Sequence, residues 1–461
     1  MSAVFDPLRL AAVSMDVMVA GHGTSAGVVA RQSVRLSLVL QAAQRGSRLY
    51  RERMPGSVTG STPLSSLPVI TRSELMQRFE DWVTDPGLKL QELRAFVADP
   101  LRVGEAYLDK YVVWESSGTS GEPGIFVQDA AAMAVYDSLE ALRRNNPRSL
   151  ARCLDPLYLS ERTAFVGATN GHFASYVTLE RLRRINPWMA GTTRSFSILQ
   201  SVDELVLGLN EFAPTIVATY PTAAALLADE AQSGRLQIKP REVWTGGESL
   251  SAATRDRVQQ TLACTVRNSY GASEFLAMGW ECGDGHLHIN ADWVILEPVD
   301  ERYRPVPAGQ PSFTVLLTNL ANTVQPLIRY DLGDQVTLHS EHCRCGSPLP
   351  TFDVQGRQDD ALVMAGSQGR RVTLLPLALT TVLEDQAGVF DFQLRQKDDH
   401  TLALRLGSRH PDAQAAMARS RMALKAYAKA QGVASMCVEG ELGHPLTRGR
   451  SGKVRRVIGK G

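Results

Sequence analysis

The stretch PTIVATYPTAAALLADEAQ, residues 214–232, carries the pattern that decides the fold. Its first seven residues form a short apolar run typical of a buried strand, and the alanine- and leucine-rich part after it has the composition of a helix. The same order returns in REVWTGG (241–247) followed by SAATRDRVQQTL (251–262). Strand, turn and helix in repeated order predict an α/β fold with a largely parallel sheet.

Segments on both sides of this stretch extend the prediction. YVVWE (111–115) predicts a strand, DAAAMAVYDSLEALRR (129–144) an amphipathic helix, and VITRSELMQRFEDWV (69–83) a helix whose N-cap is Thr71 or Ser73. From about residue 285 the pattern changes to that of antiparallel strands, and βαβ-like pieces follow residue 356. We therefore expect a large α/β domain, a β-rich appendage to it, and a smaller C-terminal domain.

Composition excludes several classes of protein. The 461 residues are 44% hydrophobic and 21% charged, and their net charge of +1 provides no bulk field for nucleic acid or an anionic membrane. No run of about 18 apolar residues predicts a membrane span, and the N-terminus lacks the pattern of a signal peptide. Six cysteines in so long a chain do not predict a disulfide framework. We therefore expect a cytoplasmic protein that binds neither membrane nor nucleic acid.

The loop SSGTSGEPG, Ser116 to Gly124, lies between a predicted strand and a predicted helix. Its hydroxyls and glycines allow hydrogen-bond donors to approach a polyphosphate closely. It is not a Walker A loop, because no Gly-Lys-Ser/Thr follows at the required spacing. Such a composition alone is more often that of a flexible turn, so its place between strand and helix is what favours a phosphate loop.

Four further motifs follow in order. In SYGASE (269–274) a tyrosine beside glycine can pack on a purine and a carboxylate can hold Mg²⁺, although a core tyrosine and a charge at a helix N-terminus are the ordinary alternatives. In RYDLGD (329–334) the final carboxylate can accept hydrogen bonds from ribose hydroxyls or can belong to a turn. The other two are WTGGE (244–248), which ends a predicted strand, and GRQDD (356–360), which is also typical of a charged linker.

The succession of these motifs, ending in Gly452-Lys453, resembles the adenylate-forming superfamily of acyl-CoA synthetases, luciferases and peptide-synthetase adenylation domains. The resemblance runs from about residue 60 to the end of the chain. Within the superfamily, LPVITRSELMQRF (67–79), SSGTSGEPG and a Cys/His signature resemble the phenylacetate-CoA ligase family. This resemblance implies an N-terminal domain that binds ATP and the acid (1–355) and a small mobile α+β C-terminal lid (356–461).

The resemblance also implies roles for individual residues of the ATP site. Tyr270 would lie against the purine, and Glu274 would hold Mg²⁺ and take part in catalysis. Asp334 would take the ribose hydroxyls, assisted by Arg357. The remaining ATP-binding residues would be Ser116, Ser117, Gly118, Thr119, Ser120 and Gly121 over the phosphates, Gly246, Gly247 and Glu248 on the adenine side, and Gly271 and Ser273.

Lys453, in SGKVRR, matches the lysine that lies between the carboxylate and the α-phosphate during adenylation, and Asp359 would be the hinge of the lid. A cation suits that place because the carboxylate attacks an anionic phosphorus. Taken alone, the basic tail from Arg448 to Lys460 is a solvated or nucleic-acid-binding patch. A zinc-stabilised nucleic-acid-binding protein is the competing class, and the near-zero net charge and the upstream motifs argue against it.

Three thiols and an imidazole suggest a metal site. Cys282, His288, Cys343 and Cys345 form a ligand set suited to tetrahedral Zn²⁺. His286 and His342 are the reserve ligands, and three unrelated buried thiols are the alternative. With four ligands no position stays open for substrate, so the metal would be structural. The resemblance supports this set, because Cys-x5-His followed by Cys-x-Cys-Gly is a zinc feature of phenylacetate-CoA ligase relatives.

The resemblance places the acid pocket near His172, Phe173 and Tyr220, each of which is also an ordinary core residue. It implies an acid–thiol ligase that activates an aromatic acid with ATP and Mg²⁺ and transfers the acyl group to coenzyme A, releasing AMP and pyrophosphate. Glu122 stands where many relatives carry lysine, and the stretch after Asp360 departs from the family pattern. An amine, a hydroxyl or a carrier-protein thiol is therefore the alternative acceptor, and a homodimer or a carrier protein the candidate partner.

Overall fold

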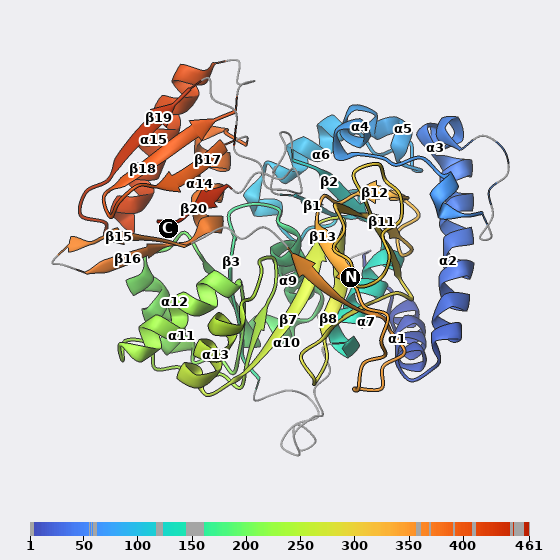
Figure 1. Cartoon of the computed structure of the whole chain (residues 1–461), viewed down its shortest axis with the longest axis horizontal. Coiled ribbons are helices and arrows are strands. Elements are labelled where there is room, and N and C mark those ends of the chain that lie inside the picture. The colour runs from blue at the N-terminus through green and yellow to red at the C-terminus, as the bar shows by residue number, and fades with distance from the viewer. Residues whose placement is uncertain are drawn as a thin grey trace.

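A nine-stranded mixed sheet forms the centre of the molecule, with the order β13-β14-β9-β8-β7-β6-β5-β3-β4 (Figure 1). The computed structural model describes residues 4–460 except 55, 57, 59–61, 117–122, 144–160, 356–360, 368–369, 391, 408–411, 443–445 and 447–455. The strands of the parallel half are β4 (Thr193–Ser197), β3 (Thr163–Gly167), β5 (Ile216–Thr219), β6 (Glu242–Thr245) and β7 (Thr265–Ala272). The antiparallel half adds β8 (Phe275–Glu281), β9 (Leu287–Ile289), β14 (Thr351–Gln355) and β13 (Gln335–Leu338).

Strand β7 joins the two halves of the sheet. Residues 265–268 pair in parallel with β6, and residues 269–272 pair antiparallel with β8. The sequence predicted the antiparallel strands after about residue 285 as an appendage, but three of them, β9, β13 and β14, continue the central sheet through β8, because β7 is long enough to pair twice. A separate three-stranded sheet contains β10 (Val294–Val299), β11 (Thr314–Asn319) and β12 (Tyr330–Asp331).

The predicted crossover helices are confirmed in the parallel half. Helix α12 (Pro221–Gln232) follows β5 and α13 (Ala252–Leu262) follows β6, as the repeated strand–turn–helix pattern requires. Their neighbours are α9 (Ala174–Ile185), α10 (Pro187–Thr192) and α11 (Val202–Phe212). Helix α11 begins with a capping box in which Ser201 and Glu204 each accept from the backbone N–H of the other.

The N-terminal part is mainly helical and includes the hairpin of β1 (Val112–Glu115) and β2 (Ile125–Gln128) (Figure 1). The sequence predicted a single helix within 69–83, opened by Thr71 or Ser73. Thr71 is the N-cap, but the backbone leaves the helical conformation at Arg78. The Arg78 side chain pairs there with Asp81 and Glu52. The helices are α1 (Pro7–Gly21), α2 (Ser25–Gly46), α3 (Arg48–Arg53), α4 (Arg72–Gln77), α5 (Phe79–Trp82), α6 (Leu90–Val97) and α7 (Ala130–Arg143), with short 3₁₀ turns at Leu64–Ser66 and Pro100–Arg102.

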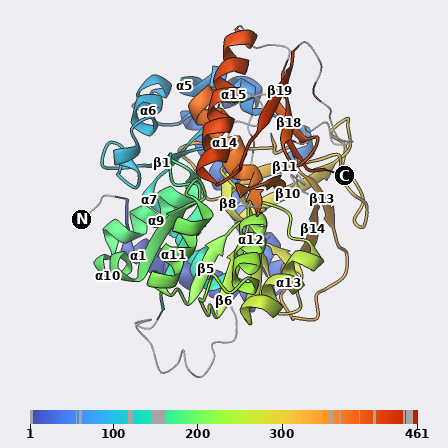
Figure 2. The ribbon, with the colours of Figure 1, turned by 90° about the vertical axis from the view of Figure 1, so that its left-hand side faces the viewer.

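The C-terminal region combines a hairpin with a four-stranded sheet covered by two helices, as the expected α+β composition requires. Figure 2 shows it above helices α11 to α13. The sheet has the order β19-β18-β17-β20. The elements are β15 (Leu362–Ala365), β16 (Arg371–Leu374), α14 (Pro376–Ala387), β17 (Phe392–Gln396), β18 (Thr401–Leu406), α15 (Ala413–Ala430), β19 (Cys437–Glu441) and β20 (Val457–Ile458).

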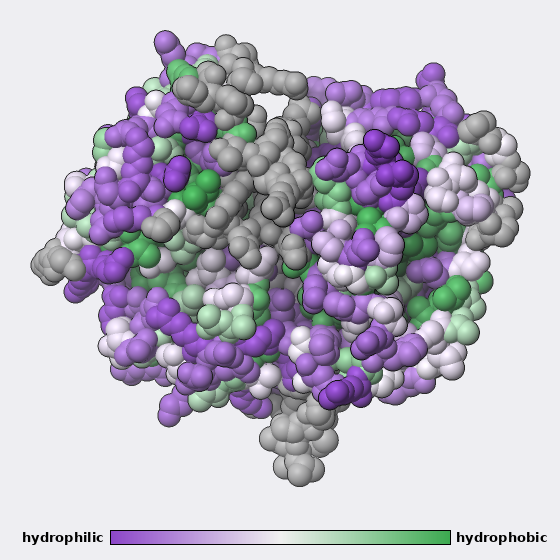
Figure 3. All heavy atoms as spheres, viewed as in Figure 1, coloured by the Kyte–Doolittle hydropathy of each residue, from purple (hydrophilic) through white to green (hydrophobic). Residues whose placement is uncertain are grey.

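Apolar residues of the C-terminal region belong to the same buried cluster as those around β3, β5 and α12. Hydrophilic residues cover much of the face seen in Figure 3, and apolar residues appear on it in smaller areas. Over the described ranges, no helix has both the length and the apolar character needed to cross a bilayer. The division at residues 355 and 356 stays a prediction, since 356–360 lie outside the described residues.

Polar contacts also hold the C-terminal region against the rest of the chain. Asn170 Nδ2 donates a hydrogen bond to Asp385 of α14, and Gln431 donates to the carbonyls of Leu199 and Gln200 at 3.1 and 2.7 Å. Burial, together with the charges of Asp385 and Glu384, raises the pKa of Glu115 to about 7. Acidic groups of the C-terminal region and of the rest of the chain therefore lie close together where the two parts meet.

Stability is expected to rise as the pH falls from 8 to 6. A carboxyl whose pKa is raised in the folded state retains its proton where the unfolded chain has lost it, so its stabilising contribution disappears as the pH rises through about 7. Glu115→Gln cannot ionise and should flatten this dependence, changing the shift in Tm by about 1 to 3 °C. Thermal unfolding followed by circular dichroism at pH 6 and pH 8 measures it. An equal pH response in wild type and variant would contradict the assignment to Glu115.

Candidate active site

A tight hairpin between β7 and β8 places Glu274. The register shifts between Tyr270 and Ala272, where the strand forms a β-bulge. Gly271 is required in this turn, because a Cβ there would lie 1.9 Å from the carbonyl oxygen of Leu276. Ser273 and Glu274 form the end of the hairpin, and β8 follows at Phe275. The alternative that Glu274 is a charge at a helix N-terminus is therefore wrong, because a strand follows it.

The Glu274 carboxylate is buried and held by two donors. Its side chain is 3% exposed, and Oε1 accepts from the Tyr330 hydroxyl at 2.7 Å and from Arg72 Nη2 at 3.2 Å. Asn319 Nδ2 donates to the backbone carbonyl of Glu274 at 3.1 Å, which fixes the turn from the other side. A carboxylate oxygen in a fixed position is a suitable ligand for Mg²⁺, which typically takes one or two carboxylates and completes its shell with phosphates and water. The residues present therefore fit Mg²⁺.

Tyr270 and Asp334, from two different motifs, meet directly. The Tyr270 hydroxyl donates to Asp334 Oδ2 at 2.7 Å, and its ring lies edge-on to Phe352 with the centroids 5.7 Å apart. Burial and the charge of Asp334 raise the pKa of Tyr270 well above its ordinary value, so the hydroxyl remains a donor. Gly333, with φ of +72°, turns the chain just before Asp334. The structure thus joins the expected purine and ribose residues.

Gly246 and Gly247 lie at the carboxyl end of β6, the edge where open α/β sheets bind ligands. Gly247 has φ of +78°, and a Cβ on it would lie 3.2 Å from the Tyr220 ring. Glu248 accepts from the backbone N–H of Thr222 at 3.0 Å and from its hydroxyl at 2.8 Å. The Glu248 carboxylate therefore sits at the start of α12, a place that the sequence did not reveal.

Ser116 closes the base of the Ser/Thr/Gly loop. Its Oγ accepts from Gly124 N–H at 2.9 Å, and its own N–H donates to the Gly124 carbonyl at 2.9 Å. Trp114, two residues earlier, donates from Nε1 to the carbonyl of Ser273 at 2.8 Å. This bond brings the base of the loop next to the turn that carries Glu274. Ser117, Gly118, Thr119, Ser120 and Gly121 lie outside the described residues.

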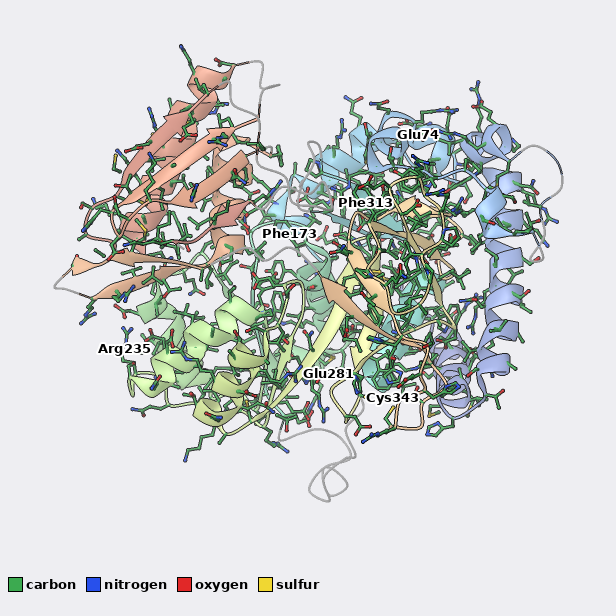
Figure 4. All side chains as sticks on the ribbon, viewed as in Figure 1. Glu74, Phe173, Arg235, Glu281, Phe313 and Cys343 are labelled. Carbon is green, nitrogen blue, oxygen red and sulfur yellow. The ribbon has the colours of Figure 1, made fainter. Side chains whose placement is uncertain are left out.

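The three candidate pocket residues occupy two different places. His172 is fully buried with its ring 5.4 Å from that of Phe96, and burial lowers its pKa, so the imidazole is neutral. Phe173 and Tyr220 instead pack against the cluster that contains β3 and β5. Burial raises the pKa of Tyr220 to about 12. Figure 4 shows Phe173 where the C-terminal region meets the N-terminal part. Tyr220 is thus the one of the three that lies beside Gly247.

Lys453, Arg357 and Asp359 lie outside the described residues, so their roles stay predictions. The chain is anchored just after Lys453. Arg456 forms a buried ion pair with Glu384 of α14 at 2.5 Å, and its carbonyl accepts from the N–H of Leu394 at 2.7 Å.

The predicted metal ligands converge at the far end of β8. One ligand atom each from Cys282, His288, Cys343 and Cys345 lies within 4.8 Å of the others. Cys282 Sγ is 3.8 Å from Cys343 Sγ, and Cys345 Sγ is 3.3 Å from His288 Nε2. Among the described residues His286 and His342 do not belong to this group, and the alternative of three unrelated thiols is wrong.

The imidazole is oriented for this group by its surroundings. His288 Nδ1 lies 2.8 Å from the Leu349 carbonyl, so it carries the proton and leaves the Nε2 lone pair toward the thiols. The ring also stacks on Trp280 at 5.0 Å. Three thiolates and one imidazole fit tetrahedral Zn²⁺. Figure 4 shows Cys343 at the lower edge of the view, away from Phe173.

Two residues of this site received no role from the sequence. Tyr330 stands inside RYDLGD and Arg72 inside LPVITR, and both were quoted only as parts of motifs. Their meeting at Glu274 depends on long-range packing, since Arg72 and Glu274 are 202 positions apart.

One sequence relative is similar over a limited stretch. Protein CapK from Staphylococcus aureus is 27% identical over 135 residues, which are 29% of this chain and 28% of CapK. The chain thus matches little more than a quarter of that relative. No protein-family model matches the sequence.

Solved structures of 2-hydroxyisobutyryl-CoA ligase match nearly the whole chain. The ligase with 2-HIB-AMP and CoA in the thioesterification state has a TM-score of 0.58 and 20% identity, over 96% of this chain and 91% of that chain. Its open conformation with the same two molecules gives a TM-score of 0.53 and 19% identity, over 95% and 93%. The mixed sheet, the three-stranded sheet and the smaller C-terminal region of this chain therefore form the same fold as that ligase.

Proposed function

We propose that this protein activates a carboxylic acid with ATP and transfers the acyl group to coenzyme A. The observation that carries the proposal is the meeting of three separate motifs, SSGTSGEPG, SYGASE and RYDLGD, around the β7–β8 turn. There the turn bearing Glu274 contacts the base of the Ser116 loop, and Tyr270 from the same hairpin contacts Asp334. The fold is shared with a ligase whose structure contains an acyl-adenylate and CoA.

The reaction would proceed in two halves. A carboxylate oxygen of the acid attacks the α-phosphorus of ATP, the bond from that phosphorus to the bridging oxygen breaks, and pyrophosphate leaves with the electron pair. The sulfur of coenzyme A then attacks the acyl carbon, the bond to AMP breaks, and the thiol proton passes to solvent. Lys453 would place its cation between carboxylate and α-phosphate in the first half, which lowers their repulsion in the transition state.

The other residues would bind and orient ATP. Tyr270 would lie against the purine, while Asp334 would accept from the ribose hydroxyls with help from Arg357. The Ser116 loop would close over the phosphates. Glu274 would hold Mg²⁺, which supplies positive charge against the phosphates when bound. Gly246 and Gly247 would allow close approach of the backbone on the adenine side, and Asp359 would be the hinge of a C-terminal lid.

The finer assignment is a member of the phenylacetate-CoA ligase family acting on an aromatic acid. Phe173 and Tyr220, which pack against the same apolar cluster, support an apolar pocket, and the Tyr220 ring adjoins Gly247. The Cys282 group would hold a structural zinc ion. The alternative acceptor is an amine, a hydroxyl or a carrier-protein thiol. It is favoured by the unusual stretch after Asp360, which folds as the β15–β16 hairpin.

Acid-dependent release of pyrophosphate is the expected result with purified protein, ATP and Mg²⁺. A panel of aryl acids, aliphatic acids and 2-hydroxyisobutyrate, each with and without coenzyme A, identifies the acid, and mass spectrometry identifies the products. Thioester formed with coenzyme A supports the proposal. Acyl-AMP that accumulates without thioester favours the second acceptor class. If no acid elicits pyrophosphate, the proposal is wrong.

A further inference from the structure

The segment LPVITR, residues 67–72, lies along strand β12. Ile70 N–H donates to the Arg329 carbonyl at 3.2 Å, and Asp331 N–H donates to the Ile70 carbonyl at 2.9 Å. Ile70 thus pairs in parallel with Tyr330. The pairing fixes the start of α4 over the Glu274 turn, so Arg72, the first residue of α4, reaches the site from the N-terminal part of the chain.

The Arg72 guanidinium is only partly used by its protein neighbours. Nη2 donates to Glu274 Oε1 at 3.2 Å, and Nε donates to the Tyr330 hydroxyl at 3.3 Å. Nη1 is also buried, yet no described residue accepts a hydrogen bond from it. A buried donor on a charged group is costly to leave unpaired, so its position calls for an acceptor that arrives with a ligand.

The surroundings of Arg72 suggest which acceptor this is. The Glu274 turn that Arg72 holds is bonded to Trp114, and Ser116, two residues further, forms the base of the expected phosphate loop. Guanidinium groups bind phosphate oxygens through strong, charge-assisted hydrogen bonds.

We infer that Arg72 binds the β- or γ-phosphate of ATP through Nη1 while Nη2 and Nε hold Glu274 and Tyr330. The inference rests on the proposed function and adds a phosphate-binding residue to it. When the bond to the α-phosphorus breaks, the electron pair moves onto the pyrophosphate oxygen. A fixed cation beside that group stabilises the charge as it develops.

The test compares ligands that possess and lack these phosphates. Arg72→Met and Arg72→Lys are titrated calorimetrically with α,β-methylene-ATP and with AMP, and the KM for pyrophosphate is measured in ATP–pyrophosphate exchange. Arg72→Met should lower the affinity for the ATP analogue about 10- to 100-fold, as expected for the loss of one charged hydrogen bond. It should also raise the KM for pyrophosphate. Affinity for AMP should change less than about twofold. Arg72→Lys, which keeps the charge, should recover part of the loss.

Arg53→Met is the matched control, since Arg53 pairs with Glu74 of the same helix α4 (Glu74 is labelled in Figure 4). It should leave both affinities unchanged. Equal losses for the ATP analogue and AMP in Arg72→Met would show that Arg72 supports the nucleotide site as a whole and does not bind these phosphates, and would overturn the inference. Unchanged affinity for the ATP analogue would also overturn it. Wild-type protein that neither binds the analogue nor releases pyrophosphate would instead refute the proposed function, and this inference with it.

Discussion

Lys453→Ala is expected to lower acid-dependent pyrophosphate release by about 1,000-fold while ATP still binds. The carboxylate and the α-phosphate are both anionic, and the lysine cation would be the group that spans them as they approach. Removing a single positioned donor of this kind typically costs about 10²- to 10³-fold in rate. Initial rates of pyrophosphate release and calorimetric titration with α,β-methylene-ATP separate the chemical step from binding.

The basic tail provides the control for this prediction. Lys460 is exposed and lies 3.7 Å from Asp399, so Lys460→Ala removes a charge from the same tail without touching the proposed reaction. It should keep wild-type rates. Full activity in Lys453→Ala would remove the role given to this residue, and equal losses in both variants would point to a general effect of tail charge.

Loss of zinc is expected from Cys282→Ser or Cys343→Ser, together with a marked fall in stability. Each variant removes one thiolate from the four-ligand group, and a metal held there would fix the chain between β8, β9 and the Cys343 loop. The free energy of unfolding should fall by an amount on the order of 5 kcal/mol, because metal binding is coupled to folding. Metal analysis of freshly purified protein and urea unfolding measure the two effects.

Cys437→Ser is the matched control, because Cys437 is an exposed free thiol on β19, outside the group. It should retain both metal and stability. Wild-type protein with less than about half an equivalent of zinc would contradict a structural site of ordinary affinity.

Strands and helices were predictable where the spacing of apolar residues within a short stretch of sequence defines them. The strand at 214–220, the helix after Pro221 and their repeat at 241–262 follow from apolar spacing alone. The path of β7 was not predictable, because its pairing with both β6 and β8 depends on strands on either side of it in the sheet. The break at Arg78 was missed for a similar reason, since its ion pair with Glu52 involves another helix.

For the site, too, the sequence identified individual residues but not the contacts between them. The motifs identified Tyr270, Glu274 and Asp334 as candidates, because carboxylates and an aromatic ring beside glycine suit a nucleotide. The sequence did not predict the hydrogen bond from Tyr270 to Asp334 or the contact of Glu248 with the start of α12, because both depend on the tertiary structure. The metal ligands were easier to predict from the sequence, because three cysteines and a histidine form a ligand set that suits a single ion.

Strand β8 determines the distance between Glu274 and the cysteine–histidine group. Glu274 directly precedes this seven-residue strand and Cys282 directly follows it. At about 3.3 Å per residue, the two positions are roughly 26 Å apart. Two unit charges at that distance interact by only about 0.6 kcal/mol at an effective dielectric constant of 20, before salt screens them further. An ion held by the thiols would thus leave the electric field at the nucleotide nearly unchanged, and it would act on Glu274 mechanically, by holding the far end of a stiff strand.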